Sequence, residues 1–252
     1  MKIVFSEKYK YRKDEILQLL ETFSQKGKTI KEGGRNTLKA FDFGDLQLNI
    51  KAFKIPNLVN KIVYRFFRKS KAERSFIYAN LLLEKGIGTP EPVAYIEKKN
   101  TFSFGKSYYI SEHLNADFTY RELIRDENFP ECEKILQEFT AFTFKLHENN
   151  ILFKDHSPGN TLIKKNGDRY EFYLVDLNRM DFKELSFEER IKNFSRLTPK
   201  KEMIAIMSEA YSKLSPWDYD KIFNTMWAET QRFQEQFFRK KRLKKKLLFR
   251  KD

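Results

Sequence analysis

Alternating hydrophobic and polar positions dominate the first part of the chain, after one short helical stretch. Apolar residues at helical spacing predict an amphipathic helix over residues 14–25. Alternation over residues 38–43 and 46–52, with a turn at Gly44-Asp45 between them, predicts a β-hairpin. Together with the glycine-containing stretch of residues 28–36, this pattern predicts three strands within the first 54 residues.

A longer helical pattern interrupts the strands in the middle of the chain. Residues 57–85 carry apolar side chains at helical spacing, and the glycines of residues 86–90 end this predicted helix. Two strands are predicted next, over residues 93–98 and 107–112. Residues 131–148 carry a continuous apolar stripe and predict another helix.

A second hairpin and a helical remainder complete the pattern. Residues 161–164 and 171–175 predict two strands around a polar turn. Residues 186–249 are helical in character, with breaks at Pro199 and Pro216. A β-rich first half and an α-rich second half predict an α+β protein with two lobes and a cleft near residue 115.

The composition suits a single two-lobed domain. The chain has 252 residues, 40% of them hydrophobic, and its 25 Phe and 12 Tyr supply large side chains for a core. No segment reaches the roughly 18 uninterrupted apolar residues of a membrane-spanning helix, and the first residues lack a secretion signal. We therefore expect the protein to be made and retained in the cytoplasm.

Cysteine and histidine usage argues against a zinc or disulfide framework. Cys132 is the only cysteine, which excludes an intrachain disulfide and a cysteine-based zinc cage. The three histidines, His113, His147 and His156, are scattered, so a histidine metal site is not expected either.

The net charge of +14 indicates a polyanionic partner, which could be nucleic acid, an anionic membrane surface or a phosphorylated glycolipid. The last fourteen residues, 239–252, carry nine basic side chains and one acidic one. In a helix, Phe238, Leu243, Leu247 and Leu248 could share a face and lie at an anionic membrane interface. The alternatives are a frayed, solvated terminus or an RNA-binding tail. A second basic stretch, residues 61–74, could be a solvated helix face.

The strongest chemical signal is the loop Lys154-Asp155-His156-Ser157-Pro158-Gly159-Asn160, followed after a hairpin by Val175-Asp176-Leu177-Asn178. Phosphoryl transfer needs a carboxylate to accept a proton from the attacking hydroxyl, and amide and carboxylate oxygens to hold magnesium. The alternative is a purely structural role, in which Asp155 and Asn160 only cap turns. The preceding helix, the hairpin and the apolar strand before Asp176 favour the catalytic interpretation.

These segments resemble the lipopolysaccharide core kinase family, which phosphorylates Kdo or heptose and is a branch of the protein-kinase-like fold. The resemblance extends from about residue 30 to about residue 200 and rests on residues 50–53, 86–93, 154–160 and 174–179. It implies one two-lobed protein-kinase-like domain over residues 1–252. Its parts would be a small β-rich N-lobe (1–115), an α-rich C-lobe (116–236) and a basic tail (237–252).

The resemblance also implies roles for individual residues. Asp155 would be the catalytic base, and Asn160 and Asp176 would hold magnesium. Lys51, on the third predicted strand, would bind the nucleotide phosphates. Lys54 is a competitor for that role, but it follows the alternating stretch, and we therefore prefer Lys51.

Two further elements of the nucleotide site are predicted less directly. Gly33 and Gly34 fall where a phosphate-covering loop should lie, although the full glycine motif of protein kinases is absent. Glu73 is our candidate for the helix acid that pairs with Lys51, and Glu84 lies near the end of the same predicted helix. The bland alternative for either acid is a solvated side chain.

The sequence departs from protein kinases at both motifs. Phe153-Lys154-Asp155 stands in place of His-Arg-Asp, and Asp176-Leu177-Asn178 in place of Asp-Phe-Gly. A regulated activation segment is therefore not expected. About 75 residues follow Asp176, which suits a small acceptor better than a docked protein.

The resemblance thus implies an ATP-dependent kinase that transfers the γ-phosphate to a sugar hydroxyl, of Kdo or heptose, in the inner core of lipopolysaccharide. ATP and Mg²⁺ would be its cofactors and an anionic glycolipid its partner, with no nucleic acid expected. The protein would be cytoplasmic and peripheral at the inner membrane, through the tail Arg239–Lys251. The alternatives are a kinase of a protein or small molecule, and a pseudokinase scaffold that binds an anionic surface.

Overall fold

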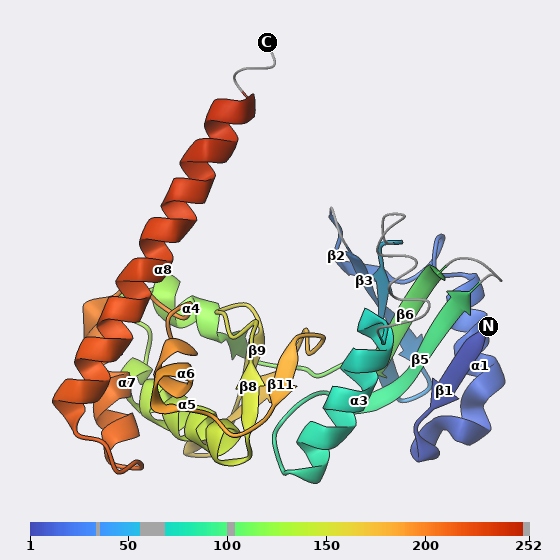
Figure 1. The fold of residues 1–252 in the computed structure, drawn as a ribbon. Helices are drawn as coiled ribbons and strands as arrows, with labels where there is room; N and C mark the ends of the chain where they lie inside the picture. Colours follow the sequence, from blue (N-terminus) through green and yellow to red (C-terminus); the bar gives the residue numbers. More distant parts are fainter. Residues whose placement is uncertain (34–35, 56–68, 100–103, 249–252) are drawn as a thin grey trace. The chain divides into compact units, whose positions relative to one another are not determined.

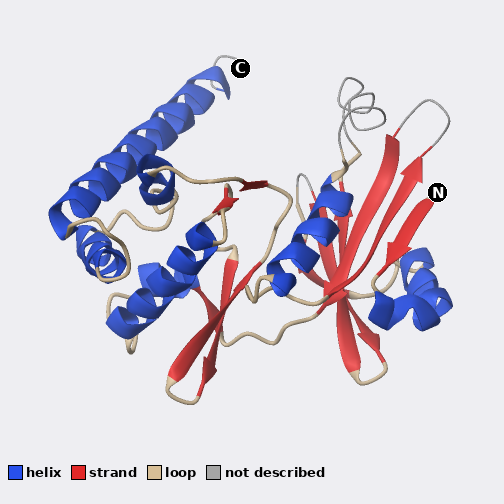
Figure 2. Ribbon diagram, turned by 60° about the horizontal axis from the view of Figure 1, so that its bottom comes forward, coloured by secondary structure: helices blue, strands red, loops and turns tan. Residues whose placement is uncertain are grey.

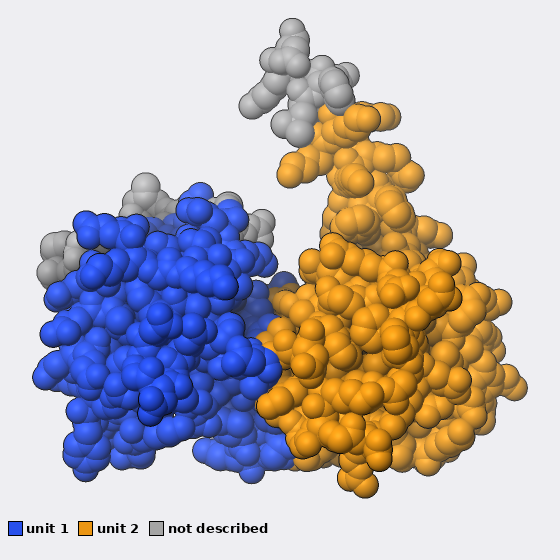
Figure 3. Space-filling view, turned by 180° about the vertical axis from the view of Figure 1, so that it is seen from behind, with its two compact units in different colours: residues 1–115, 174–179 blue, residues 116–173, 180–252 orange. Residues whose placement is uncertain are grey.

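The computed structural model describes residues 1–33, 36–55, 69–99 and 104–248 of the chain. Figure 3 shows its two compact units in different colours. Unit 1 comprises residues 1–115 and 174–179, and unit 2 comprises residues 116–173 and 180–252. A six-residue piece of the second half of the chain, which includes Asp176, therefore belongs to the first unit.

Unit 1 is built on a six-stranded sheet with the order β1-β5-β6-β4-β3-β2, in which every neighbouring pair is antiparallel. Its strands are β1 (Lys2–Phe5), β2 (Lys28–Lys31), β3 (Asn36–Phe43), β4 (Leu46–Phe53), β5 (Pro92–Lys99) and β6 (Phe104–Glu112). The predicted hairpin is confirmed: β3 and β4 pair directly, and Gly44 between them has a φ of 62°, which suits glycine. β1 is an addition, so four strands rather than three precede residue 54 in the described chain.

Helices cover both faces of this sheet (Figure 2). On one face, the short 3-10 helix η1 (Glu7–Arg12) and α1 (Lys13–Glu21) place Ile16 in a cluster with Ile50 of β4. On the other face, α3 (Lys71–Glu84) packs Phe76 against Phe53 of β4. Because side chains alternate along a strand, Lys51 projects to the α3 face and Ala52 to the α1 face.

Local signals define both ends of α3. Ser70 caps its start, with its hydroxyl accepting a hydrogen bond from the amide of Glu73. At its end Gly86 has a φ of 64°, and the amides of Gly86 and Ile87 donate to the carbonyls of Leu83 and Leu82. This Schellman motif explains why the predicted helix stops there. The earlier part of that prediction, residues 57–68, lies outside the described residues.

Unit 2 is mostly helical and contains two small sheets. The three-stranded sheet has the order β10-β9-β7, and the two-stranded sheet pairs β11 with β8. Its elements are β7 (Phe118–Thr119), α4 (Tyr120–Arg125), α5 (Cys132–Glu148), β8 (Ile151–Phe153), β9 (Thr161–Asn166), β10 (Arg169–Leu174), β11 (Met180–Phe182), α6 (Phe187–Lys192), α7 (Lys201–Ser212) and α8 (Tyr219–Leu248). The predicted helix over residues 131–148 is thus confirmed as α5, whose aromatic and aliphatic residues form the core of the unit together with α7 and the start of α8.

The helix α8 is anchored only through its first half. Ile222, Met226 and Thr230, spaced four residues apart, are buried against neighbouring helices. Every residue from Glu235 to Lys246 is exposed, and Figure 1 shows this part of α8 projecting beyond α6 and α7. Among the described residues, no helix is long and apolar enough to cross a membrane.

The exposed half of α8 does not have the single apolar face that the sequence suggested. At about 100° per residue, Phe238 and Leu243 stand roughly 140° apart around the helix axis. Both are about half exposed, at 48% and 54%. Basic residues lie between and around them, so this half of the helix is cationic on most sides. The prediction of one shared apolar face was therefore wrong.

Candidate active site

The predicted phosphate-binding lysine and the predicted metal-binding aspartate meet within unit 1. Lys51 Nζ lies 2.7 Å from Asp176 Oδ1, and both side chains are partly buried. Asn178 Nδ2 donates to the same oxygen at 2.6 Å. Both contacts use Oδ1.

The segment that carries Asp176 is fixed to unit 1 by backbone pairing. The amide of Leu174 donates to the carbonyl of Gly88 at 2.9 Å, and Thr89 Oγ1 donates to the carbonyl of Leu174 at 2.8 Å. Thr89 is buried, so this pairing is shielded from water. Asp176 itself has a φ of 63°, a left-handed conformation that aspartate tolerates better than most residues.

Glu73, the predicted partner of Lys51, makes a different ion pair. Its carboxylate lies 2.8 Å from Lys2 Nζ on β1 and accepts a longer hydrogen bond from Tyr95 at 3.4 Å. Burial is the largest single influence and lowers the pKa of Lys2, but the hydrogen bond that Lys2 donates to Glu73 and its other interactions with Glu73 and Tyr95 together outweigh burial and raise the pKa of Lys2. The sequence did not reveal Lys2 as a partner because β1 is too short to show a pattern.

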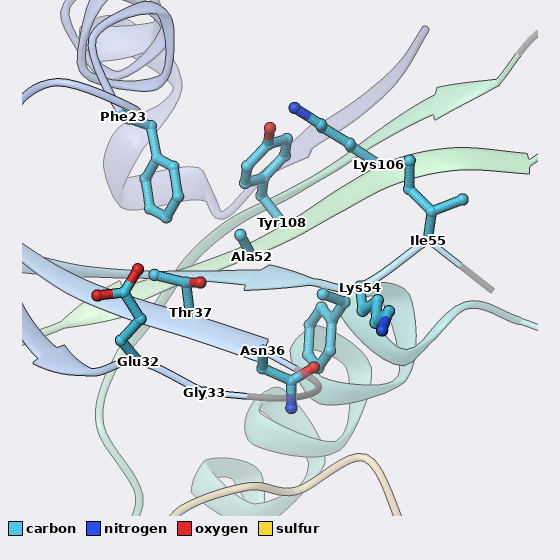
Figure 4. Close-up of a pocket in the computed structure, with 11 residues that line it drawn as sticks. Phe23, Glu32, Gly33, Asn36, Thr37, Ala52, Lys54, Ile55, Lys106 and Tyr108 are labelled. Carbon is cyan, nitrogen blue, oxygen red and sulfur yellow. The ribbon is translucent and has the colours of Figure 1, made fainter.

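The predicted glycine loop borders a cavity of about 460 Å³ (Figure 4). Gly33 lines it, whereas Gly34 lies outside the described residues. Phe23, Ala52 and Tyr108 form part of its wall, and these side chains belong to the α1 face of the sheet. Phe53, whose side chain belongs to the α3 face, lines it as well, and neither Lys51 nor Asp176 does.

In unit 2, the loop Lys154–Asn160 connects β8 to β9 and closes on itself. Asn160 Nδ2 donates to the carbonyl of Asp155 at 2.8 Å, and the amide of Asn160 donates to the carbonyl of Ser157 at 2.9 Å. Lys154 Nζ pairs with Asp181 Oδ2 on β11 at 2.5 Å. The spacing of five residues thus brings the predicted base and the predicted amide ligand onto one tight turn.

A buried polar chain supports the strand before this loop. Asn193 donates through Nδ2 to the carbonyl of Phe153 at 2.9 Å, and its Oδ1 lies 3.3 Å from His147 Nε2. His147 Nδ1 lies 3.0 Å from the hydroxyl of Tyr211. Because an amide oxygen only accepts, Nε2 of His147 carries the proton and Nδ1 accepts from Tyr211. No sequence pattern pointed to Asn193 or Tyr211.

Both histidines near the loop are buried and neutral. Burial lowers the pKa of His147 to about 3 and that of His156 to about 4. The ring of His156 packs among Phe139, Phe153 and Phe194, with centroid separations of 5.3, 5.8 and 6.3 Å. His156 therefore supports the residue beside it, Asp155, as part of the core rather than as a charged group.

The oxygen donors of the two motifs suit a hard divalent cation such as Mg²⁺. Asn160 uses Nδ2 for its bond to the carbonyl of Asp155, and Asp176 uses Oδ1 for its contacts with Lys51 and Asn178. Carboxylate and amide oxygens are the ligand types that Mg²⁺ prefers. Within the described part of the chain, no group of three or more His, Cys, Asp and Glu side chains could hold a metal ion.

Comparison with solved structures defines the class of protein. A chain described as "WaaP in complex with acyl carrier protein" is similar over 94% of this chain and 99% of its own length, with a TM-score of 0.66 and 14% sequence identity. The protein therefore has the two-lobed, kinase-like α+β fold. This chain belongs to the lipopolysaccharide kinase (Kdo/WaaP) family, whose model matches residues 21–221. A search of curated protein sequences finds no match.

Family membership confirms the predicted resemblance and makes the protein a kinase-type phosphotransferase of lipopolysaccharide biosynthesis. The matched range includes every residue that we predicted for the site: Gly33, Gly34, Lys51, Glu73, Asp155, Asn160 and Asp176. Their individual roles stay predictions.

Proposed function

We propose that the protein transfers the γ-phosphate of ATP to a hydroxyl group of Kdo or heptose in the inner core of lipopolysaccharide. The observation that carries the proposal is the Lys51–Asp176 ion pair in a chain of this family. A site for a nucleoside triphosphate requires a lysine and a metal-binding carboxylate close together, because the lysine binds the phosphates and the carboxylate holds the metal ion on them.

Each unit contributes part of the proposed machinery. In unit 1, Lys51 would bind the nucleotide phosphates and Asp176 would hold Mg²⁺, which neutralises developing charge on the transferred group. In unit 2, Asn160 would supply a second ligand for Mg²⁺, and Asp155 would orient the sugar hydroxyl and accept its proton. The closed turn between Asp155 and Asn160 keeps these two groups in a fixed relation.

Gly33, Gly34 and Glu73 have supporting roles in this proposal. Backbone amides around Gly33 and Gly34 would donate to phosphate oxygens. Glu73 would pair with Lys51 only after releasing Lys2, the partner that it has in this structure. A nucleotide that draws Lys51 away from Asp176 would favour such an exchange.

The direct test is transfer of labelled γ-phosphate from ATP and Mg²⁺ to purified lipid A that carries Kdo. We expect label on the glycolipid, and none on lipid A that lacks the inner-core sugars. Hydrolysis of ATP or autophosphorylation without labelled glycolipid would retain the kinase but replace the acceptor by a protein or small molecule. Failure of the protein to bind Mg-ATP would favour a scaffold without turnover.

The exposed half of α8 would hold the enzyme at the cytoplasmic face of the inner membrane. Its cations remain in solvent, where the negative surface potential of anionic lipids attracts each by about 1 kcal/mol. Phe237, Phe238 and Leu243 add exposed apolar area that could enter the headgroup region. The tail was predicted over Arg239–Lys251, of which residues 249–251 lie outside the described chain.

Replacing Lys240 and Lys241 together by glutamine is expected to weaken binding to phosphatidylglycerol-rich vesicles about thirtyfold, because roughly 2 kcal/mol of attraction is lost. Vesicle sedimentation measures this partition. The matched control replaces Lys26 and Lys28, exposed lysines of unit 1, by glutamine and should leave binding unchanged. Equal binding of all three proteins, or equal binding to neutral phosphatidylcholine vesicles, would refute a role for the helix.

A further inference from the structure

Two arginine side chains lie against the loop Lys154–Asn160 in unit 2, and neither belongs to a motif that the sequence analysis identified. Arg196 follows α6, and its Nη1 donates to the carbonyl of Lys154 at 2.9 Å and lies 3.4 Å from Asp155 Oδ1. The guanidinium also lies over the ring of Phe233 on α8, 5.6 Å from the ring centroid. Arg196 therefore has a defined position beside the proposed base.

Arg121, in the first turn of α4, occupies the other end of the loop. A Cβ atom placed on Gly159 would clash with its Nη2 and would lie 3.2 Å from its Cζ. The φ of Gly159 is not positive, so its backbone conformation does not require glycine. The guanidinium of Arg121 therefore lies against Gly159 in this structure.

The two arginines are thus attached to one short turn. Arg196 contacts the start of the loop, at Lys154 and Asp155, and Arg121 lies against Gly159 near its end. The hydrogen bond from Asn160 to the carbonyl of Asp155 brings these two ends together. The Arg196–Asp155 separation of 3.4 Å is longer than the 2.7–2.9 Å that is typical of a charge-assisted hydrogen bond. Both of its hydrogen bonds to the loop use Nη1.

Both guanidinium groups also reach solvent. Arg121 is exposed, and 38% of the Arg196 side chain is exposed. A guanidinium keeps its charge at any pH at which the enzyme would work, and its planar donors match the geometry of carboxylate and phosphate oxygens. A neutral sugar offers no such anion. The surroundings of Asp155 therefore favour an acceptor that carries negative charge close to its reacting hydroxyl.

We propose that Arg121 and Arg196 form an acceptor subsite that binds a carboxylate or phosphate group of the sugar next to the hydroxyl that Asp155 deprotonates. The inference rests on the proposed kinase function and deepens it, because it selects acidic or already phosphorylated sugars over neutral ones. The γ-phosphate of ATP has the same anionic chemistry, and the experiment must separate these two sources.

The test compares Arg121→Gln and Arg196→Gln with Arg125→Gln, a matched control on the same helix whose arginine is also exposed. Two quantities are measured for each protein with Kdo-bearing lipid A in detergent: affinity for the glycolipid without nucleotide, and the KM values for glycolipid and ATP. Loss of a charge-assisted contact predicts about a tenfold to hundredfold weaker glycolipid binding and a matching rise in its KM. The KM for ATP should change less than about twofold, and Arg125→Gln should behave as the wild type.

Arg121→Lys and Arg196→Lys separate binding from folding. Each retains a positive charge and should recover part of the glycolipid affinity, whereas a purely structural role would show as a lowered Tm without such recovery. A rise in the KM for ATP with unchanged glycolipid affinity would assign the arginines to the nucleotide and overturn the proposal. So would equal affinity of wild type and variants for the glycolipid.

The nucleotide-free binding measurement distinguishes the two levels of inference. If the wild type binds the glycolipid through these arginines but transfers no phosphate to it, the result supports the subsite and refutes the proposed reaction. If phosphate is transferred and neither arginine affects the binding of the glycolipid or its KM, the result supports the reaction and refutes the subsite.

Discussion

Replacing Asp155 by asparagine is expected to lower kcat for phosphate transfer about 10²–10⁴-fold while the affinity for ATP stays nearly unchanged. Asparagine has nearly the same shape and leaves the backbone carbonyl that Asn160 binds, so the loop should keep its conformation. It cannot accept the proton of the attacking hydroxyl. Initial rates with labelled ATP measure kcat, and equilibrium titration with a fluorescent ATP analogue measures affinity.

The matched control is Asp168→Asn, which removes an exposed carboxylate from the β9–β10 turn of the same unit. We expect wild-type kcat for this control and the same Tm for both variants. A rate within threefold of wild type for Asp155→Asn would remove Asp155 from the reaction. A combined loss of activity and ATP binding would instead indicate a role in holding the nucleotide.

Unit 2 is expected to lose stability as the pH falls from about 6.5 towards 4, because two histidines are buried in the neutral state. Their folded pKa values, about 3 for His147 and about 4 for His156, lie below the value of about 6.5 in an unfolded chain. The unfolded state therefore binds protons that the folded state excludes. Stability from this source is complete above pH 6.5 and falls by about 1.4 kcal/mol per pH unit for each histidine below it.

The variant His156→Phe tests this expectation. A phenyl ring cannot take up a proton, and it should fit the site because the ring of His156 already packs among aromatic side chains. Between pH 7 and pH 5, we expect the variant to lose about 2 kcal/mol less stability than the wild type, as measured by urea unfolding at both values. The control is Phe139→Leu, a change in the same aromatic cluster, which should lower stability by the same amount at pH 7 and at pH 5. If His156→Phe loses as much stability between pH 7 and pH 5 as the wild type does, His156 takes up its proton in the folded protein.

Those parts of the fold that repeat a pattern over many residues were predictable. Alternation along β3 and β4 and the apolar stripe of α5 are local properties, and the structure confirms these elements to within two residues. β1, β8 and β11 were missed, because strands of three or four residues are too short for a period to appear. Their formation depends on partners far along the chain, as in the pairing of β8 with β11.

In the candidate site, too, a residue within a repeating pattern was predictable, whereas contacts between distant parts of the chain were not. Lys51 was preferred because it lies within the alternating strand, and its contact with Asp176 supports that choice. The partners of Glu73 and Asp155 could not be read from sequence. Lys2 lies 71 residues from Glu73, and Arg196 lies 41 residues from Asp155, so only tertiary structure brings them together.

The membership of residues 174–179 in unit 1 has a practical consequence for dissection of this protein. The polypeptide passes from one unit to the other three times, after residues 115, 173 and 179. A fragment that ends at Asn115 would contain Lys51 but lack Asp176, and it would also lack the backbone that pairs with Gly88 and Thr89. No single proteolytic cut can release an intact unit, so limited proteolysis should yield nicked protein that stays associated. To isolate unit 1, residues 174–179 would have to be fused after residue 115 through a designed linker.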